Sequence, residues 1–159
     1  MKNFVTSDLR TDEKMNHAGG QGPMYIKHLL GKEELNDKCG LYAEVTIPAG
    51  SALGYHEHVG NSETYYVLKG HALYNDNGSI REIGPGEVTF TPNGFKHGVD
   101  NTKGTEDFVF MALLLMTDQV LRNSLQLTNR YELKAVSFYT TIYPGAPRNA
   151  TPSTPTFII

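Results

Sequence analysis

The chain has 159 residues, and 14 lysine and arginine residues against 17 aspartate and glutamate residues give it a formal net charge of −3. A chain of this length fits one domain that can bury a hydrophobic core without disulfide staples. The near-neutral charge and the lack of basic blocks exclude nucleic acid as an expected partner. The single cysteine, Cys39, excludes an intrachain disulfide and a zinc finger built on cysteines.

Long apolar segments are absent from the sequence. The first twenty residues are polar, with no apolar core of signal-peptide length, and nowhere do about 18 apolar residues follow one another. The longest apolar run, residues 108–116, fits one buried strand. We therefore expect no membrane partner and a cytoplasmic location.

Between residues 24 and 116 the pattern predicts short strands separated by turns. Residues 40–48 alternate apolar and polar side chains, with the period of two that is typical of a half-buried strand. Asp76-Asn77-Gly78 predicts a hairpin turn, because Asn and Gly adopt positive φ at low cost. The expected strands are residues 24–30, 40–48, 63–69, 71–75, 79–83, 87–91 and 106–116.

These strands, spaced about ten residues apart, predict an all-β sandwich or barrel, which we place at residues 21–117. Residues 1–20 are polar and are expected to form a loosely held N-terminal arm. Residues 118–159 are expected to form a C-terminal extension. Its first part, residues 118–136, is either a helix or a further strand, and its proline-rich end, residues 144–159, is extended or disordered.

Three of the six histidines fall into two clusters, and the first cluster carries two of them. It consists of Gly50, His56, His58, Glu63 and Gly70, separated by five, one, four and six residues. On a strand, side chains two residues apart point to the same face, so both imidazoles can reach one ion. A turn-like stretch follows the second histidine and can bring the glutamate beside them.

The second cluster supplies one more imidazole from a different hairpin. It consists of Gly86, Pro92, Gly94, His97 and Asn101, separated by five, one, two and three residues. The glycines and the proline of both clusters are expected to shape turns rather than to contact a ligand.

Three neutral imidazoles and one carboxylate form a mixed nitrogen and oxygen ligand set. Such a set suits Mn, Fe, Co, Ni or Zn better than Ca or Mg, which prefer oxygen ligands. Four protein ligands around an octahedral ion leave two positions for water, substrate or oxygen. A divalent ion with one carboxylate carries a net charge of +1, which favours an anionic guest such as a carboxylate or an enolate.

Both clusters resemble the two motifs of the cupin superfamily, G(X)5HXH(X)3–4E(X)6G and G(X)5PXG(X)2H(X)3N, and every specified position is matched. The resemblance covers residues 40–116 and implies a small β-barrel of the jelly-roll type. It implies that His56, His58, Glu63 and His97 hold one divalent transition metal (Fe, Mn, Ni, Zn or Co) inside the barrel. It also implies a homodimer, in which residues 23–30 could be exchanged between chains to cover an open sheet edge.

Other polar residues near the clusters have less distinct roles. Tyr65 shares strand parity with Glu63, so its hydroxyl could orient a substrate or pass a proton; core packing with a satisfied hydroxyl is the alternative. We take Glu63 and Tyr65 as candidate catalytic residues. Glu57 should face the other side of the sheet, and His17 and His71 fit neither cluster and are interpreted as incidental.

The resemblance implies a small-molecule ligand without choosing the reaction. Small cupins include isomerases, lyases, decarboxylases and dioxygenases, so we expect a metal-dependent enzyme acting on a small oxygen-rich metabolite: a carboxylate, an enol or a sugar. The alternative is a non-catalytic cupin that contains a metal and binds a small ligand. A structural metal also remains open. The lack of an attached DNA-binding segment favours the enzyme.

Overall fold

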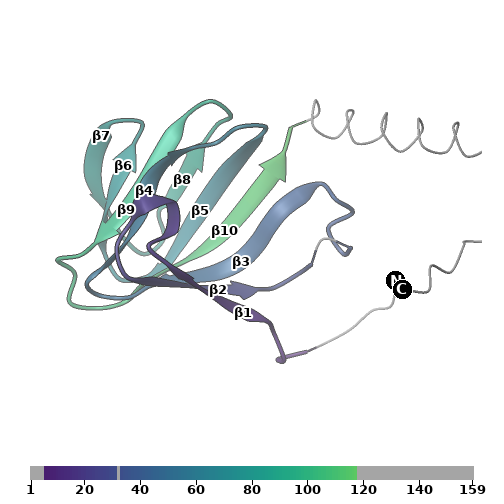
Figure 1. The fold of residues 1–159 in the computed structure, drawn as a ribbon, viewed down its shortest axis with the longest axis horizontal. Coiled ribbons are helices and arrows are strands. Elements are labelled where there is room, and N and C mark those ends of the chain that lie inside the picture. Colours follow the sequence, from purple (N-terminus) through teal and green to yellow (C-terminus); the bar gives the residue numbers. More distant parts are fainter. Residues whose placement is uncertain (1–5, 32, 118–159) are drawn as a thin grey trace, which may run out of the picture. The chain divides into compact units, whose positions relative to one another are not determined.

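The computed structural model describes residues 6–31 and 33–117, all of which belong to one compact unit, Met1–Leu121 (Figure 1). The predicted helix or strand at 118–136 and the predicted extended tail at 144–159 lie outside the described residues. No helix in the described part of the chain is long and apolar enough to cross a membrane. The elements are β1 (Thr11–Met15), the 3-10 turn η1 (His17–Gly19), β2 (Pro23–His28), β3 (Cys39–Ile47), β4 (Ser51–Glu57), β5 (Asn61–Lys69), β6 (Ala72–Asp76), β7 (Ser79–Ile83), β8 (Val88–Thr91), β9 (Lys96–Asn101) and β10 (Phe108–Met116).

The strands form two antiparallel sheets (Figure 1). One sheet has the strand order β1-β2-β3-β10-β5-β8, and the other has the order β4-β9-β6-β7. Consecutive strands repeatedly cross from one sheet to the other, as in a jelly roll. The predicted all-β jelly-roll fold is therefore confirmed. In this single chain β2 pairs with β3, and the exchanged strand of a homodimer stays a prediction.

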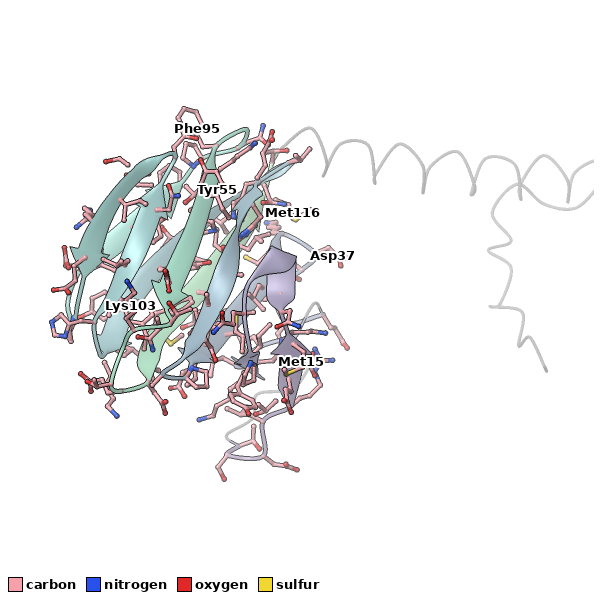
Figure 2. The ribbon with its side chains drawn as sticks, turned by 60° about the vertical axis from the view of Figure 1, so that its left-hand side comes forward. Met15, Asp37, Tyr55, Phe95, Lys103 and Met116 are labelled. Atoms are coloured by element: carbon pink, nitrogen blue, oxygen red, sulfur yellow. The ribbon has the colours of Figure 1, made fainter. Side chains whose placement is uncertain are left out.

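Apolar side chains from both sheets fill the space between them (Figure 2). The alternation predicted at residues 40–48 is confirmed, because Ala43, Val45 and Ile47 of β3 all face the core. Each lies opposite a buried residue of β10; Val45 pairs with Phe110, and Ile47 pairs with Phe108. These two central strands form one wall of the barrel interior.

The turn predictions are confirmed by backbone geometry. The hairpin between β6 and β7 turns at Asn77 and Gly78, whose φ angles are 48° and 99°. Gly70 ends β5 with a φ of 76°, and a Cβ at this position would lie 2.4 Å from the carbonyl oxygen of Asp107. Glycine is therefore required at position 70, because the backbone has a positive φ there and the chain at Asp107 leaves no room for a Cβ. The other motif glycines, Gly50, Gly86 and Gly94, also have positive φ.

The N-terminal segment differs from the sequence-based expectation. A loosely held arm was expected for residues 1–20, but β1 lies within this segment and pairs along its whole length with β2, from Thr11 opposite Lys27 to Met15 opposite Pro23. Most side chains of β1 are exposed. An outer strand whose side chains are mostly exposed needs no alternation of apolar residues, so the sequence carries no signal for it.

Candidate metal centre

The four predicted ligands meet at one end of the barrel, between the two sheets. His56 lies on β4 directly opposite His97 of β9, and His58 follows the end of β4. Glu63 reaches the same point from β5, in the other sheet. One ligand atom from each of the four lies within 4.8 Å of the other three, a group that could hold a metal ion. His58, Glu63 and His97 are buried, and His56 is half-buried.

A register shift in β4 turns the histidines toward the interior. Leu53 pairs with Val99 and His56 pairs with His97, so β4 has one residue more than β9 between these two pairs. Such a bulge reverses the parity of the strand, because side chains otherwise alternate between the two faces. Leu53 is buried, Tyr55 is exposed, and His56 faces inward again. Without the extra residue Tyr55 would take the place of the histidine.

Hydrogen bonds at Nδ1 orient two of the imidazoles. His56 Nδ1 lies 2.8 Å from the carbonyl oxygen of Gly54, and His58 Nδ1 lies 2.5 Å from Oδ1 of Asn61. Both oxygens only accept, so the two Nδ1–H groups are the donors. A neutral ring with its proton on Nδ1 carries a lone pair on Nε2, the atom that then binds a metal.

The third imidazole is held by two hydroxyls. His97 Nδ1 lies 2.9 Å from Thr91 Oγ1 and 3.0 Å from the hydroxyl of Tyr74, and the two hydroxyls lie 2.9 Å apart. On the other side of the ring, Nε2 lies 2.9 Å from His58 Nε2 and 3.2 Å from Glu63 Oε2. The hydroxyls can accept the Nδ1 proton, which leaves Nε2 directed at the common point of the four ligands.

The carboxylate at this point is buried and ionised. Burial by itself raises the pKa of Glu63. In the metal-free protein, hydrogen bonds from the His58 and His97 rings when they carry a proton on Nε2, the charge of His97 and a hydrogen bond from Tyr65 lower that pKa to about 2. Hydrogen bonding to Glu63 raises the pKa of His58. A buried carboxylate beside imidazole nitrogens calls for a cation, and three nitrogens with one oxygen fit a divalent transition metal.

Tyr65 points into the barrel, as its parity with Glu63 predicts. Its hydroxyl donates a hydrogen bond to Glu63 Oε2 at 2.9 Å and lies 3.3 Å from His97 Nε2. Burial first, and then the charge of Glu63, raise the pKa of Tyr65 well above its usual value. Its ring packs on Phe110, with 4.1 Å between the ring centroids. The hydroxyl thus stays protonated and orients the carboxylate.

Three of the candidate ligands, His56, His58 and Glu63, line a cavity of about 280 Å³. Its polar lining includes His17, Asn61 and Glu57. Glu57 is exposed and pairs with Lys96 at 3.8 Å, which agrees with its exclusion from the ligand set. The cavity walls are mostly apolar: Met24, Ile26, Leu41, Val45, Leu53, Phe110, Ala112 and Leu114.

His17 is the residue that sequence reasoning missed. It was interpreted as incidental, yet it lines the same cavity as His56, His58 and Glu63. It lies far from both motifs in the sequence, and only the pairing of its loop with β4 brings it there. No local pattern in the sequence contains this information. The companions of His97, Tyr74 and Thr91, were missed for the same reason.

Comparisons with known proteins agree with this geometry. The model of the cupin domain family matches residues 43–114. A curated oxalate-binding protein from Thermotoga maritima is 37% identical over 111 residues, which cover 70% of this chain and 91% of that protein. The chain belongs to the cupin family.

Solved structures place this cupin in the same fold. The crystal structure of a predicted oxalate decarboxylase from Thermotoga maritima matches with a TM-score of 0.67 and 35% identity, over 73% of this chain and all of that one. The polyketide cyclase RemF from Streptomyces resistomycificus matches with a TM-score of 0.59 and 23% identity, over 72% of this chain and 79% of that one. At 23% identity, the similarity to RemF shows only that the two proteins share a fold.

Proposed function

We propose that this cupin binds one divalent transition metal through His56, His58, Glu63 and His97 and holds a small oxygen-rich anion on the remaining coordination positions of the metal. The observation that carries the proposal is the convergence of three imidazoles and an ionised carboxylate at one point, where three of these four side chains line a mostly apolar cavity. An octahedral ion held by four protein ligands would keep two positions for a guest.

Charge and size define the guest. A divalent metal and one carboxylate give the centre a net charge of +1, and apolar walls strengthen its attraction for an anion because they lower the local dielectric constant. A cavity of about 280 Å³ admits only a small molecule. The oxalate-binding relative supports a small dicarboxylate such as oxalate as the first candidate.

We propose catalysis by Glu63 and Tyr65 as the next step. The bound metal would act as a Lewis acid toward the anion. Tyr65 donates to Glu63 Oε2 and so holds the carboxylate in place. The single proton of this hydroxyl is directed at Glu63, so a guest oxygen would accept it only in place of that carboxylate. Decarboxylation of the hydrogen oxalate ion to formate and carbon dioxide is the reaction to test first, since the structural relative is a predicted oxalate decarboxylase.

Binding without turnover is the second candidate. Apart from the metal ligands, the titratable side chains that line the cavity in the described part of the chain are His17, Glu57 and Tyr65. Tyr65 already bonds Glu63, and Glu57 already pairs with Lys96. The small number of available proton donors, together with the name of the oxalate-binding relative, favours this alternative.

Metal analysis and calorimetry test the proposal. Protein purified without a tag, chelator or added metal should contain or take up about one equivalent of a divalent transition metal. The metal-loaded protein should bind oxalate. The double variant His56→Ala/His97→Ala should stay folded and bind neither the metal nor oxalate. Formation of formate would select the enzyme over the binding protein. Less than about a tenth of an equivalent of metal, with no uptake on titration, would contradict the proposal.

A further inference from the structure

A short loop, residues 16–22 between β1 and β2, reaches the metal cavity. It contains η1 and lies beside β4, where the dark purple ribbon passes the β4 label in Figure 1. The loop places His17 on the lining of the cavity, together with His56 and Glu57. One histidine from the N-terminal segment is therefore added to the site formed by the two motifs.

The loop is fixed to β4 by its backbone. Gln21 and Ala52 exchange two hydrogen bonds, of 3.0 Å and 2.7 Å, and the Gln21 side chain donates to the Gly50 carbonyl at 2.9 Å. Gly54 allows the close approach, because a Cβ there would lie 1.9 Å from the carbonyl oxygen of Ala18. The loop thus packs directly against the strand that carries His56.

Strained backbone conformations in the loop indicate a defined shape. Asn16 and Ala18 have φ angles of 50° and 52°, a left-handed conformation that is unfavourable for alanine. Asn16 offsets this strain by bonding Gly22 twice: its N–H donates to the carbonyl and its Oδ1 accepts from the N–H, both at 2.9 Å. Strain of this kind persists where the surrounding contacts enforce it, and it is concentrated at functional sites.

The side chain of His17 is the available donor in the cavity lining. Among the described residues none forms a hydrogen bond or ion pair with its ring, and His17 is exposed. The other polar groups beside the ligands are engaged: Asn61 accepts from His58, and Tyr65 donates to Glu63. A guest on the metal would therefore find one uncommitted ring N–H, that of His17.

We infer that His17 binds the end of the guest that faces away from the metal, with its ring N–H donating to a carboxylate oxygen. The inference rests on the proposed function and deepens it. A guest held by the metal at one end and by His17 at the other needs oxygen atoms at both ends. A small dicarboxylate meets this condition, whereas formate, with one carboxylate, can occupy only the metal end.

Calorimetry on the full chain loaded with Mn²⁺ tests this assignment. Oxalate and formate are titrated into the wild type, His17→Ala, His17→Gln and His71→Ala. His71 is a matched control, an exposed histidine that does not line the cavity. His17→Ala should weaken oxalate binding by about tenfold or more, the effect of losing one hydrogen bond to a charged group. His17→Gln, which retains an N–H donor, should recover part of the loss.

Three further readouts separate a role in binding from a role in folding. Formate affinity and Mn²⁺ affinity of His17→Ala should stay within about twofold of the wild type, and His71→Ala should match the wild type throughout. Equal oxalate affinity of wild type and His17→Ala would overturn the assignment of His17 alone, and so would an equal loss for formate and oxalate. A wild type that binds no Mn²⁺, or binds Mn²⁺ and no oxalate, would overturn the proposed function and the assignment with it.

Discussion

Removing both hydroxyls beside His97 should weaken metal binding much more than removing either one. Thr91 Oγ1 and the Tyr74 hydroxyl both lie within 3.0 Å of His97 Nδ1, and all three residues are buried. In Thr91→Val or Tyr74→Phe one hydroxyl remains to accept the Nδ1 proton. In the double variant that proton has no acceptor on the side of the ring away from the metal ligands.

The expected magnitude follows from the two positions that the imidazole proton can occupy. A buried N–H without a partner costs about 1–3 kcal/mol. The ring can avoid this cost by moving the proton to Nε2, where Glu63 Oε2 lies 3.2 Å away and accepts it. That form lacks the Nε2 lone pair, so a metal must first displace the proton. The double variant should therefore bind metal about 10- to 100-fold more weakly, and each single variant only a few-fold more weakly.

Competition calorimetry with Mn²⁺ and Co²⁺ measures the affinities. Nitrogen NMR of the metal-free protein should show a larger fraction of His97 rings with the proton on Nε2 alone in the double variant than in the wild type. Thr64→Val is the matched control. It removes a hydroxyl on β5 that donates to the carbonyl of Thr89 on β8, the strand that also carries Thr91, and that has no hydrogen bond to a histidine among the described residues.

Two results would refute this reasoning. The first is a double variant that binds metal as tightly as the wild type, which would mean that the hydroxyls do not control the proton on His97. The second is a double variant whose loss equals the sum of the two single losses, which would mean that the hydroxyls act independently. Thermal unfolding of the metal-free variants separates a general loss of stability from a loss of affinity.

Two further predictions concern stability and assembly. Asn101 is buried, and its Nδ2 group donates to the carbonyls of Ile47 and Glu106 at 3.0 Å and 2.9 Å. Asn101→Ala should destabilise the protein by about 2 kcal/mol or more, because both carbonyls lose this donor. An unchanged melting temperature would contradict this role of Asn101. Light scattering should give twice the chain mass of 17.6 kDa if the homodimer implied by the family resemblance forms, and a mass of one chain would show that the prediction is wrong.

The sequence by itself determined the fold class and predicted the four residues of the candidate metal centre. Alternation at residues 40–48 selected the buried face of β3, and Asn77-Gly78 marked the β6–β7 hairpin. These signals are local, since a strand face and a turn depend on residues a few positions apart. The spacing of the two motifs predicted which four side chains come together, because the family pattern records which positions of the folded barrel meet.

The tertiary structure alone decided how the ligands are presented. The extra residue of β4 that brings Leu53 and His56 to the same face appears only in the pairing with β9. Tyr74 and Thr91 reach His97 from two other strands, β6 and β8, in different sheets.

The position of the N-terminal segment was likewise decided by the tertiary structure alone. The polar sequence of β1 and the loop that carries His17 show no local pattern, yet β1 extends a sheet and the loop lines the metal cavity. Their positions are fixed by backbone hydrogen bonds to β2 and β4. Backbone hydrogen bonds use the N–H and C=O groups that every residue except proline carries on the main chain. The side chains of a segment therefore do not reveal which strand that segment will pair with.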